Sequence, residues 1–85
     1  MSKVCSLAET VELMRSENYV DRFKAEYYQL SIRYNKLRNM INKWDDNKLS
    51  FEPNCPRSIY DIQIKAMKDY LAVLEARAVI EDIEL

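Results

Sequence analysis

The sequence predicts an all-α fold: a long antiparallel helical hairpin with a short N-terminal helix, assembled into a homo-oligomer. Three observations support this fold. Two long stretches carry apolar residues at alternating steps of three and four, a loop with two prolines separates them, and the chain has no glycine and no alternating strand pattern. A chain of 85 residues is expected to form one domain, 1–85, with helices at roughly 6–17, 19–44 and 58–82.

The first helix, 6–17, is expected to begin at a capping box, in which a serine and a glutamate three residues later satisfy free amides at the helix start. Ser6-Leu-Ala-Glu9 has this pattern. One face of the helix would then carry three apolar residues: Leu7, Val11 and Met14. This spacing predicts a short helix that packs beside the hairpin along that face.

The second helix, 19–44, has an unbroken apolar seam, spaced as in a coiled coil. Asn18 is expected to cap its start and Asp45-Asp46-Asn47 to end it. At 1.5 Å per residue it would be about 39 Å long, and a helix of that length cannot bury its stripe alone. It must therefore lie against another long helix. Its seam consists of Val20, Phe23, Tyr27, Leu30, Tyr34, Leu37, Ile41 and Trp44.

The third helix, 58–82, supplies the partner seam. Ser58 is expected to cap it, with Asp61 in its first turn. The seam repeats at the same steps, as Ile64, Met67, Leu71, Leu74, Ala78 and Glu81. A second apolar row runs beside it, through Ala66, Tyr70, Val73 and Ile80. Because this arc is wider than one partner helix needs, we expect it to meet another subunit.

Charge is segregated along the chain, although the formal net charge is only −1. From 19 to 44, six basic against two acidic side chains leave +4; from 58 to 85, three basic against six acidic leave −3. Opposed charge on packed antiparallel helices is one interpretation, and a local basic patch for an anion is the other. Near-neutral net charge and the lack of a recognition motif argue against binding to duplex nucleic acid.

The composition argues against an enzyme. The chain has no histidine, which removes the usual general base near neutral pH, and no metal-ligand spacing, so we expect neither a cofactor nor a metal site. Cys5 and Cys55 stand alone and are expected to be free thiols. With no long apolar run and no signal-peptide pattern, we expect a cytoplasmic protein that does not bind membranes.

Four of the six tyrosines lie on the basic helix: Tyr19, Tyr27, Tyr28 and Tyr34. Two of them, Tyr27 and Tyr34, belong to the apolar seam, so core packing explains them. Tyr19 lies at the helix start, where free amides attract anions. An aromatic face beside arginine and lysine suits a nucleobase and a phosphate, because base stacking is worth ~1–3 kcal/mol. The tyrosines therefore suggest nucleotide binding as a hypothesis for the function.

Two sets of residues match one known pattern. The second helix contributes Arg22, Glu26, Leu30, Arg33, Lys36 and Leu37, with arginine in place of lysine at position 33. The third helix contributes Gln63, Ile64, Met67, Tyr70, Val73, Leu74 and Arg77. Together they resemble a family of small helical phage proteins, the anti-CBASS sponges, which sequester the cyclic oligonucleotide signals of bacterial immunity. The resemblance extends over both long helices.

The resemblance implies a compact homohexamer that holds cyclic dinucleotides in pockets between protomers, and in some members cyclic trinucleotides at separate sites. It implies capture without cleavage, in the cytoplasm of an infected bacterial host. The family stacks a base on a tyrosine near the start of the long helix, which corresponds to Tyr19. It binds phosphate through a lysine further along, for which Arg33 and Lys36 are both candidates. The alternative function is a non-enzymatic helical oligomeric module that binds a protein partner.

Overall fold

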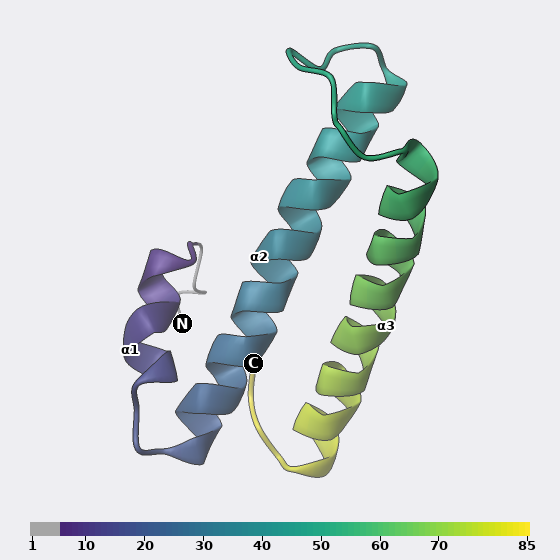
Figure 1. Ribbon diagram of the computed structural model, residues 1–85. Helices are drawn as coiled ribbons and strands as arrows, with labels where there is room; N and C mark the ends of the chain where they lie inside the picture. The colour runs from purple at the N-terminus through teal and green to yellow at the C-terminus, as the bar shows by residue number, and fades with distance from the viewer. Residues whose placement is uncertain (1–5) are drawn as a thin grey trace.

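The computed structural model of the protein describes residues 6–85 (Figure 1). In these residues a 3-10 turn, η1 (Ala8–Thr10), leads into a short helix, α1 (Val11–Met14), followed by two long helices, α2 (Tyr19–Asp45) and α3 (Arg57–Ile80). No strand occurs among them, so the all-α prediction is confirmed for this part of the chain.

Helices α2 and α3 lie side by side and run in opposite directions, and α1 packs against α2 on the side away from α3 (Figure 1). Contacts at both ends of the pair fix this arrangement. The Tyr19 hydroxyl at the start of α2 lies 2.8 Å from the Glu81 carboxylate just after α3. At the other end, the rings of Trp44 and Tyr60 meet edge to face, with centroids 5.8 Å apart.

The core lies between the two long helices, near the start of α2. Phe23, Leu74 and Ala78 form its buried centre, and Leu74 is 0% exposed. Half-buried side chains pack around these three: Tyr27, Leu30, Ile83 and Leu85. None of the eight seam residues predicted for the second helix is exposed in the structure. The seam therefore faces α3, and burial of its apolar surface is the main force that holds the two helices together.

A side chain caps the start of α2, and a residue in the left-handed conformation follows the end of each long helix, where glycine is common in other proteins. Asn18 caps α2 by accepting a hydrogen bond from the Val20 amide at 2.9 Å, as predicted. After each helix one residue takes a positive φ, 59° at Asn47 and 57° at Asp82. Asparagine and aspartate tolerate this conformation better than most residues. The second of these turns directs Ile83 and Leu85 back onto the core.

The first helix is shorter than the predicted 6–17. The 3-10 turn η1 takes Ala8–Thr10, and α1 runs only from Val11 to Met14. The Ser16 hydroxyl donates to the Asp21 carboxylate at 2.8 Å and accepts from the Asn18 amide at 3.0 Å. These local bonds stabilise a turn at the expense of further helix. The predicted capping box forms only in part: Ser6 Oγ accepts from the Glu9 amide at 3.4 Å and donates to its carboxylate at 3.1 Å, but the N-cap of η1 is Leu7.

The third helix also differs from the predicted 58–82, because it begins at Arg57, with Pro56 as its N-cap, and ends at Ile80. Ser58 is therefore not the cap. Pro56 is extended (φ −60°, ψ 147°) and therefore lies just outside the helix, so that Arg57 is the first helical residue. At the other end, the left-handed turn at Asp82 stops the helix. Arg57 then pairs with Asp45 at 3.2 Å and with Asp61, which joins the end of α2 to the start of α3.

The structure tests only part of the prediction about cysteines. Cys55 is half-buried in the loop before α3 and makes no disulfide with any residue of 6–85. Cys5 lies outside the described residues. The prediction that both are free thiols stays a prediction.

Three tyrosine–glutamate hydrogen bonds join the polar edges of α2 and α3. The hydroxyls of Tyr19 and Tyr27 donate to Glu81 and Glu75, each at 2.8 Å, and the Tyr70 hydroxyl donates to Glu26. Burial, followed by the hydrogen bond to Glu75, raises the pKa of Tyr27 to about 12 from its ordinary value of 10.0. Tyr27 therefore remains a hydrogen-bond donor well above neutral pH, and the three bonds tie together the edges of the two packed helices.

Replacing Leu74 with alanine should lower the free energy of unfolding by about 2–5 kcal/mol, because it removes a wholly buried side chain and leaves a cavity. Val79→Ala is the matched control on the same helix, since Val79 is 82% exposed. Urea denaturation of both variants would measure the effect. Equal midpoints for the two variants would contradict the assignment of Leu74 to the core.

Tyr27→Phe should cost about 1 kcal/mol at neutral pH through the lost hydrogen bond to Glu75. The wild-type advantage should then shrink as the pH rises from 10 to 12. The raised pKa favours neutral Tyr27 in the fold, so this contribution is complete below the unfolded pKa and lost as the pH passes the folded pKa. Melting temperatures of both proteins across that range would measure it; a constant difference would contradict the assignment.

Candidate functional site

A basic stripe runs along α2, on a different side of the helix from the seam. Its members follow one another at alternating steps of four and three, which places them on one face. The stripe contains four cations and one carboxylate, and five of its seven residues are exposed. It consists of Arg22, Glu26, Gln29, Arg33, Lys36, Met40 and Lys43. Two hollows in the surface lie along this stripe.

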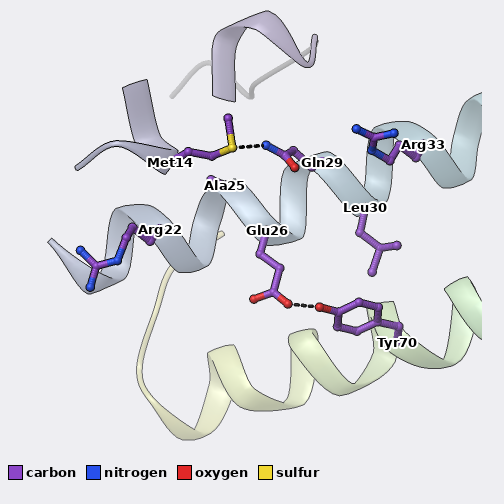
Figure 2. Close-up of a pocket in the computed structure, with 8 residues that line it drawn as sticks. All are labelled: Met14, Arg22, Ala25, Glu26, Gln29, Leu30, Arg33 and Tyr70. Atoms are coloured by element: carbon purple, nitrogen blue, oxygen red, sulfur yellow. Dashed lines mark hydrogen bonds between the residues drawn. The ribbon is translucent and has the colours of Figure 1, made fainter. Parts of the chain in front are cut away.

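The large hollow has a volume of about 460 Å³ and lies along α2, with Met14 of α1 lining it on one side and Tyr70 of α3 on the other (Figure 2). Its apolar lining comes from Met14 of α1 with Ala25 and Leu30 of α2. Its polar lining consists of Arg22, Glu26, Gln29, Arg33 and Tyr70. A concave surface with apolar walls and a few polar groups is typical of small-molecule sites.

The wall between α1 and α2 is fixed by Gln29. Its side-chain amide donates to Thr10 Oγ1 at 3.0 Å and contacts Met14 Sδ at 2.7 Å, the second of which Figure 2 shows. Thr10 is wholly buried, and its hydroxyl donates to the Leu7 carbonyl at 2.6 Å. Because both partners of Gln29 come from the short N-terminal segment, this glutamine holds that segment against α2.

The charges of the large hollow are separated. Arg22 and Arg33 lie at opposite ends, while Glu26 lies between them and accepts from the Tyr70 hydroxyl (Figure 2). Arg22 donates to the Ser16 carbonyl at 2.8 Å. Arg33 makes no ion pair with any residue of 6–85 and is exposed. The Arg33 end of the hollow is therefore the better place for an anion, because Arg22 already donates to a carbonyl and Glu26 is four residues from Arg22 but seven from Arg33.

The structure separates the three residues that the sequence predicts for the site. Arg33 lines the large hollow, Lys36 lines a second hollow further along the stripe, and Tyr19 lines neither. Tyr19 and Arg33 are fourteen residues apart on one straight helix, which is about 21 Å at 1.5 Å per residue. One chain therefore does not bring these side chains to a single small ligand.

Tyr19 is part of a polar cluster at the open end of the hairpin. Its hydroxyl donates to Glu81 at 2.8 Å and accepts from Arg77 at 2.7 Å, while Arg77 lies 4.9 Å above the Phe23 ring. The hydrogen bond to Glu81 is the largest cause that raises the pKa of Tyr19. The two hydrogen bonds hold the ring of Tyr19 in one orientation. Because Tyr19 is still 46% exposed, its ring remains open to stacking.

Sequence reasoning missed two groups in the large hollow. Tyr70 was assigned to the spare apolar face of the third helix, but its hydroxyl turns toward Glu26 of α2. Gln29 was not singled out, because a lone glutamine on an amphipathic helix carries no periodic signal. The pairing of Tyr70 with Glu26 becomes visible only when the register of the two helices is known.

Among residues 6–85, no group of three or more metal-ligating side chains could hold a metal ion. No helix among the same residues is long and apolar enough to cross a membrane.

Comparisons with known proteins give one match. The family model described as Sequestin matches residues 17–80, which include all of α2 and α3 and therefore the whole basic stripe. The name of this family suggests a sequestering function. No curated protein and no solved structure matches the chain. Since the matched segment is most of its length, the chain belongs to the Sequestin family.

Proposed function

We propose that this protein binds a cyclic dinucleotide signal of bacterial immunity and holds it without cleaving it. Membership of the Sequestin family, over both long helices, is the observation that carries the proposal. The name of the family fits sequestration, and the resemblance to phage anti-CBASS sponges supports the choice of ligand class. The proposed setting is a phage protein in the cytoplasm of an infected host, where capture of the signal keeps it from its effector.

The chemistry of the stripe supports a phosphorylated ligand. A cyclic dinucleotide has two negative phosphates and two base faces, so it needs cations and aromatic surfaces. Arg33 and Lys36 are exposed cations three residues apart on α2, and Tyr19 presents a ring that is nearly half-exposed. Sequestration requires only affinity, and the sequence has no histidine, the commonest general base in enzymes.

The distance along α2 supports a composite site. About 21 Å of rigid helix separates Tyr19 from Arg33, and two copies of the chain can shorten this distance by placing Tyr19 of one beside Arg33 of the other. We therefore place the base on Tyr19 of one protomer and the phosphate on Arg33 or Lys36 of another. This arrangement makes the homo-oligomer, a hexamer by the resemblance, a requirement for binding.

An exposed face of α3 supports self-association. Seven residues on this face repeat at alternating steps of three and four, and four large apolar members are 49–81% exposed: Ile59, Ile62, Val73 and Ile80. The other members are Ala66, Asp69 and Ala76, and Asp69 is paired with Lys65 at 3.0 Å. An exposed heptad seam of this kind can pack against the same seam of a second copy. We therefore propose that another protomer covers this face.

A cyclic dinucleotide should raise the melting temperature of the wild type, because a ligand that binds only the folded state stabilises it. Tyr19→Ala should weaken binding roughly ten- to a hundredfold through lost stacking, whereas Tyr19→Phe keeps the ring and should bind nearly as well. Arg33→Gln and Lys36→Gln should weaken binding and flatten its salt dependence. Lys68→Gln, on α3, is the control for loss of a charge. Calorimetry would measure binding by the wild type and all five variants.

Mass spectrometry of the ligand after heat denaturation distinguishes capture from catalysis. Intact cyclic dinucleotide is expected, and linear or cleaved nucleotide would contradict sequestration. If no member of a panel of cyclic di- and trinucleotides binds the wild type, the proposed function is wrong.

Val73→Asp should break the oligomer, because it places an unpaired charge in the exposed α3 seam. Lys68→Asp introduces the same side chain on an exposed site of another face of α3 and should leave the assembly intact. Light scattering would measure the masses at micromolar concentration. A monomeric wild type would contradict the oligomer and with it the composite site.

A further inference from the structure

The loop after α2 forms a second, smaller hollow that the matched residue pattern does not explain. This lysine hollow has a volume of about 290 Å³. Helix α2 contributes Lys36, Asn39, Met40 and Lys43, and the loop contributes Lys48, Leu49, Ser50 and Phe51. Only one of these eight residues, Lys36, was predicted from the sequence to bind a ligand. The lysine hollow is thus a separate feature from the large hollow beside α1.

The end of α2 holds the loop in place. Asn47, with its positive φ, reverses the chain, and the Lys48 amide donates to the Lys43 carbonyl at 2.8 Å. This pairing of amide and carbonyl is the usual closed end of a helix. It brings Lys48 and Phe51 back beside the last turns of α2, opposite Lys36 and Lys43. A short-range backbone bond therefore shapes the hollow.

Every charged side chain that lines the lysine hollow is a lysine. Lys36, Lys43 and Lys48 make no ion pair with any residue of 6–85. No carboxylate lines the lysine hollow. Of the acidic residues that neighbour it in the sequence, Asp45 pairs with Arg57 at 3.2 Å, and Glu52 lines a different hollow. Three like charges around one small space repel each other, and a phosphate between them would replace that repulsion with charge-assisted hydrogen bonds.

The helix dipole acts against this site, because the last carbonyls of a helix repel anions. Here those carbonyls are occupied. The Asn42, Lys43 and Trp44 oxygens accept hydrogen bonds from backbone amides that follow the helix, at 2.8–3.1 Å. These three carbonyl oxygens therefore point at amides, and the full charges of the three lysines outweigh the partial negative charge that remains at the end of α2.

The lysine hollow also offers a surface for a flat ring. The Phe51 side chain is 55% exposed, and Met40 and Leu49 extend the apolar lining. Stacking of a base on an exposed aromatic side chain is worth ~1–3 kcal/mol, which is enough to favour a nucleotide over free phosphate. Asn39 and Ser50 add a side-chain amide and a hydroxyl that can bond to a base or a sugar.

We propose that the lysine hollow is a second binding site, which takes a single nucleoside monophosphate with its phosphate among the three lysines and its base on Phe51. The lysine hollow is smaller than the large one, about 290 against 460 Å³, which favours a mononucleotide over a cyclic dinucleotide. All of its lining comes from one chain, so the site is complete without a second protomer; of its residues, Lys36 alone is also a candidate for the composite site proposed above.

Calorimetric titration with AMP, adenosine and inorganic phosphate tests the proposal directly. AMP should bind the wild type in a saturable way, at least tenfold more tightly than either adenosine or phosphate alone, because each of these carries only half of the recognised chemistry. The affinity for AMP should fall with added salt. No saturable binding of AMP, or equal affinity for AMP and phosphate, would overturn the assignment to a nucleotide.

Variants locate the site. Lys43→Gln, Lys48→Gln and Phe51→Ala should each weaken AMP binding by about tenfold, and the exposed positions of these side chains should leave the melting temperature unchanged. Lys68→Gln controls for overall charge, and Arg33→Gln controls for the large hollow. Both should bind AMP as the wild type does. If either control weakens binding as much as Lys43→Gln, AMP binds elsewhere or through net charge only, and the proposal is wrong.

The two proposals fail independently. A protein that binds cyclic dinucleotides but not AMP would overturn the lysine hollow and leave sequestration standing. Binding of AMP without any cyclic dinucleotide would do the reverse. Phe51→Ala should also leave binding of the cyclic dinucleotide unchanged, because Phe51 belongs to the lysine hollow and not to the composite site.

Discussion

The packing of the α2 seam against α3 is the interaction on which the rest of the structure depends. A helix of 27 residues with a continuous apolar stripe is unstable in water unless another surface covers that stripe. Phe23 and Leu74 supply the buried centre of this contact. Once their register is fixed, Tyr19 lies beside Glu81 and Tyr27 beside Glu75, so the polar bonds at the edges follow from the apolar packing.

Sequence reasoning predicted what periodicity determines. The eight seam residues of the second helix, its Asn18 cap and the helix stop near Asn47 could all be predicted, because local spacing and side-chain chemistry fix them. The first helix was predicted, but its length was not, since competing hydrogen bonds from Ser16 end it early. Such bonds depend on side-chain geometry around a turn, which a pattern of apolar residues does not describe.

The candidate site was less predictable for a physical reason. Helical spacing tells which residues share a face of α2, and Arg33 and Lys36 are both exposed on such a face. It does not tell where that face is hollowed. The large hollow needs Met14 from α1 and Tyr70 from α3, and the lysine hollow needs Phe51 from a loop without periodicity. Both hollows arise where other segments meet α2, so only the fold reveals them.

The rigidity of α2 makes the proposed capture depend on assembly. Tyr19 and Arg33 cannot approach each other within one chain, because the helix between them is held along its length by α3. A ligand that joins residues of two protomers stabilises the assembled state relative to separate chains, by the linkage that couples binding to folding. A sponge built in this way would gain affinity as its concentration rises, because the complete site exists only in the oligomer. That behaviour suits a protein that must titrate a signal rather than turn it over.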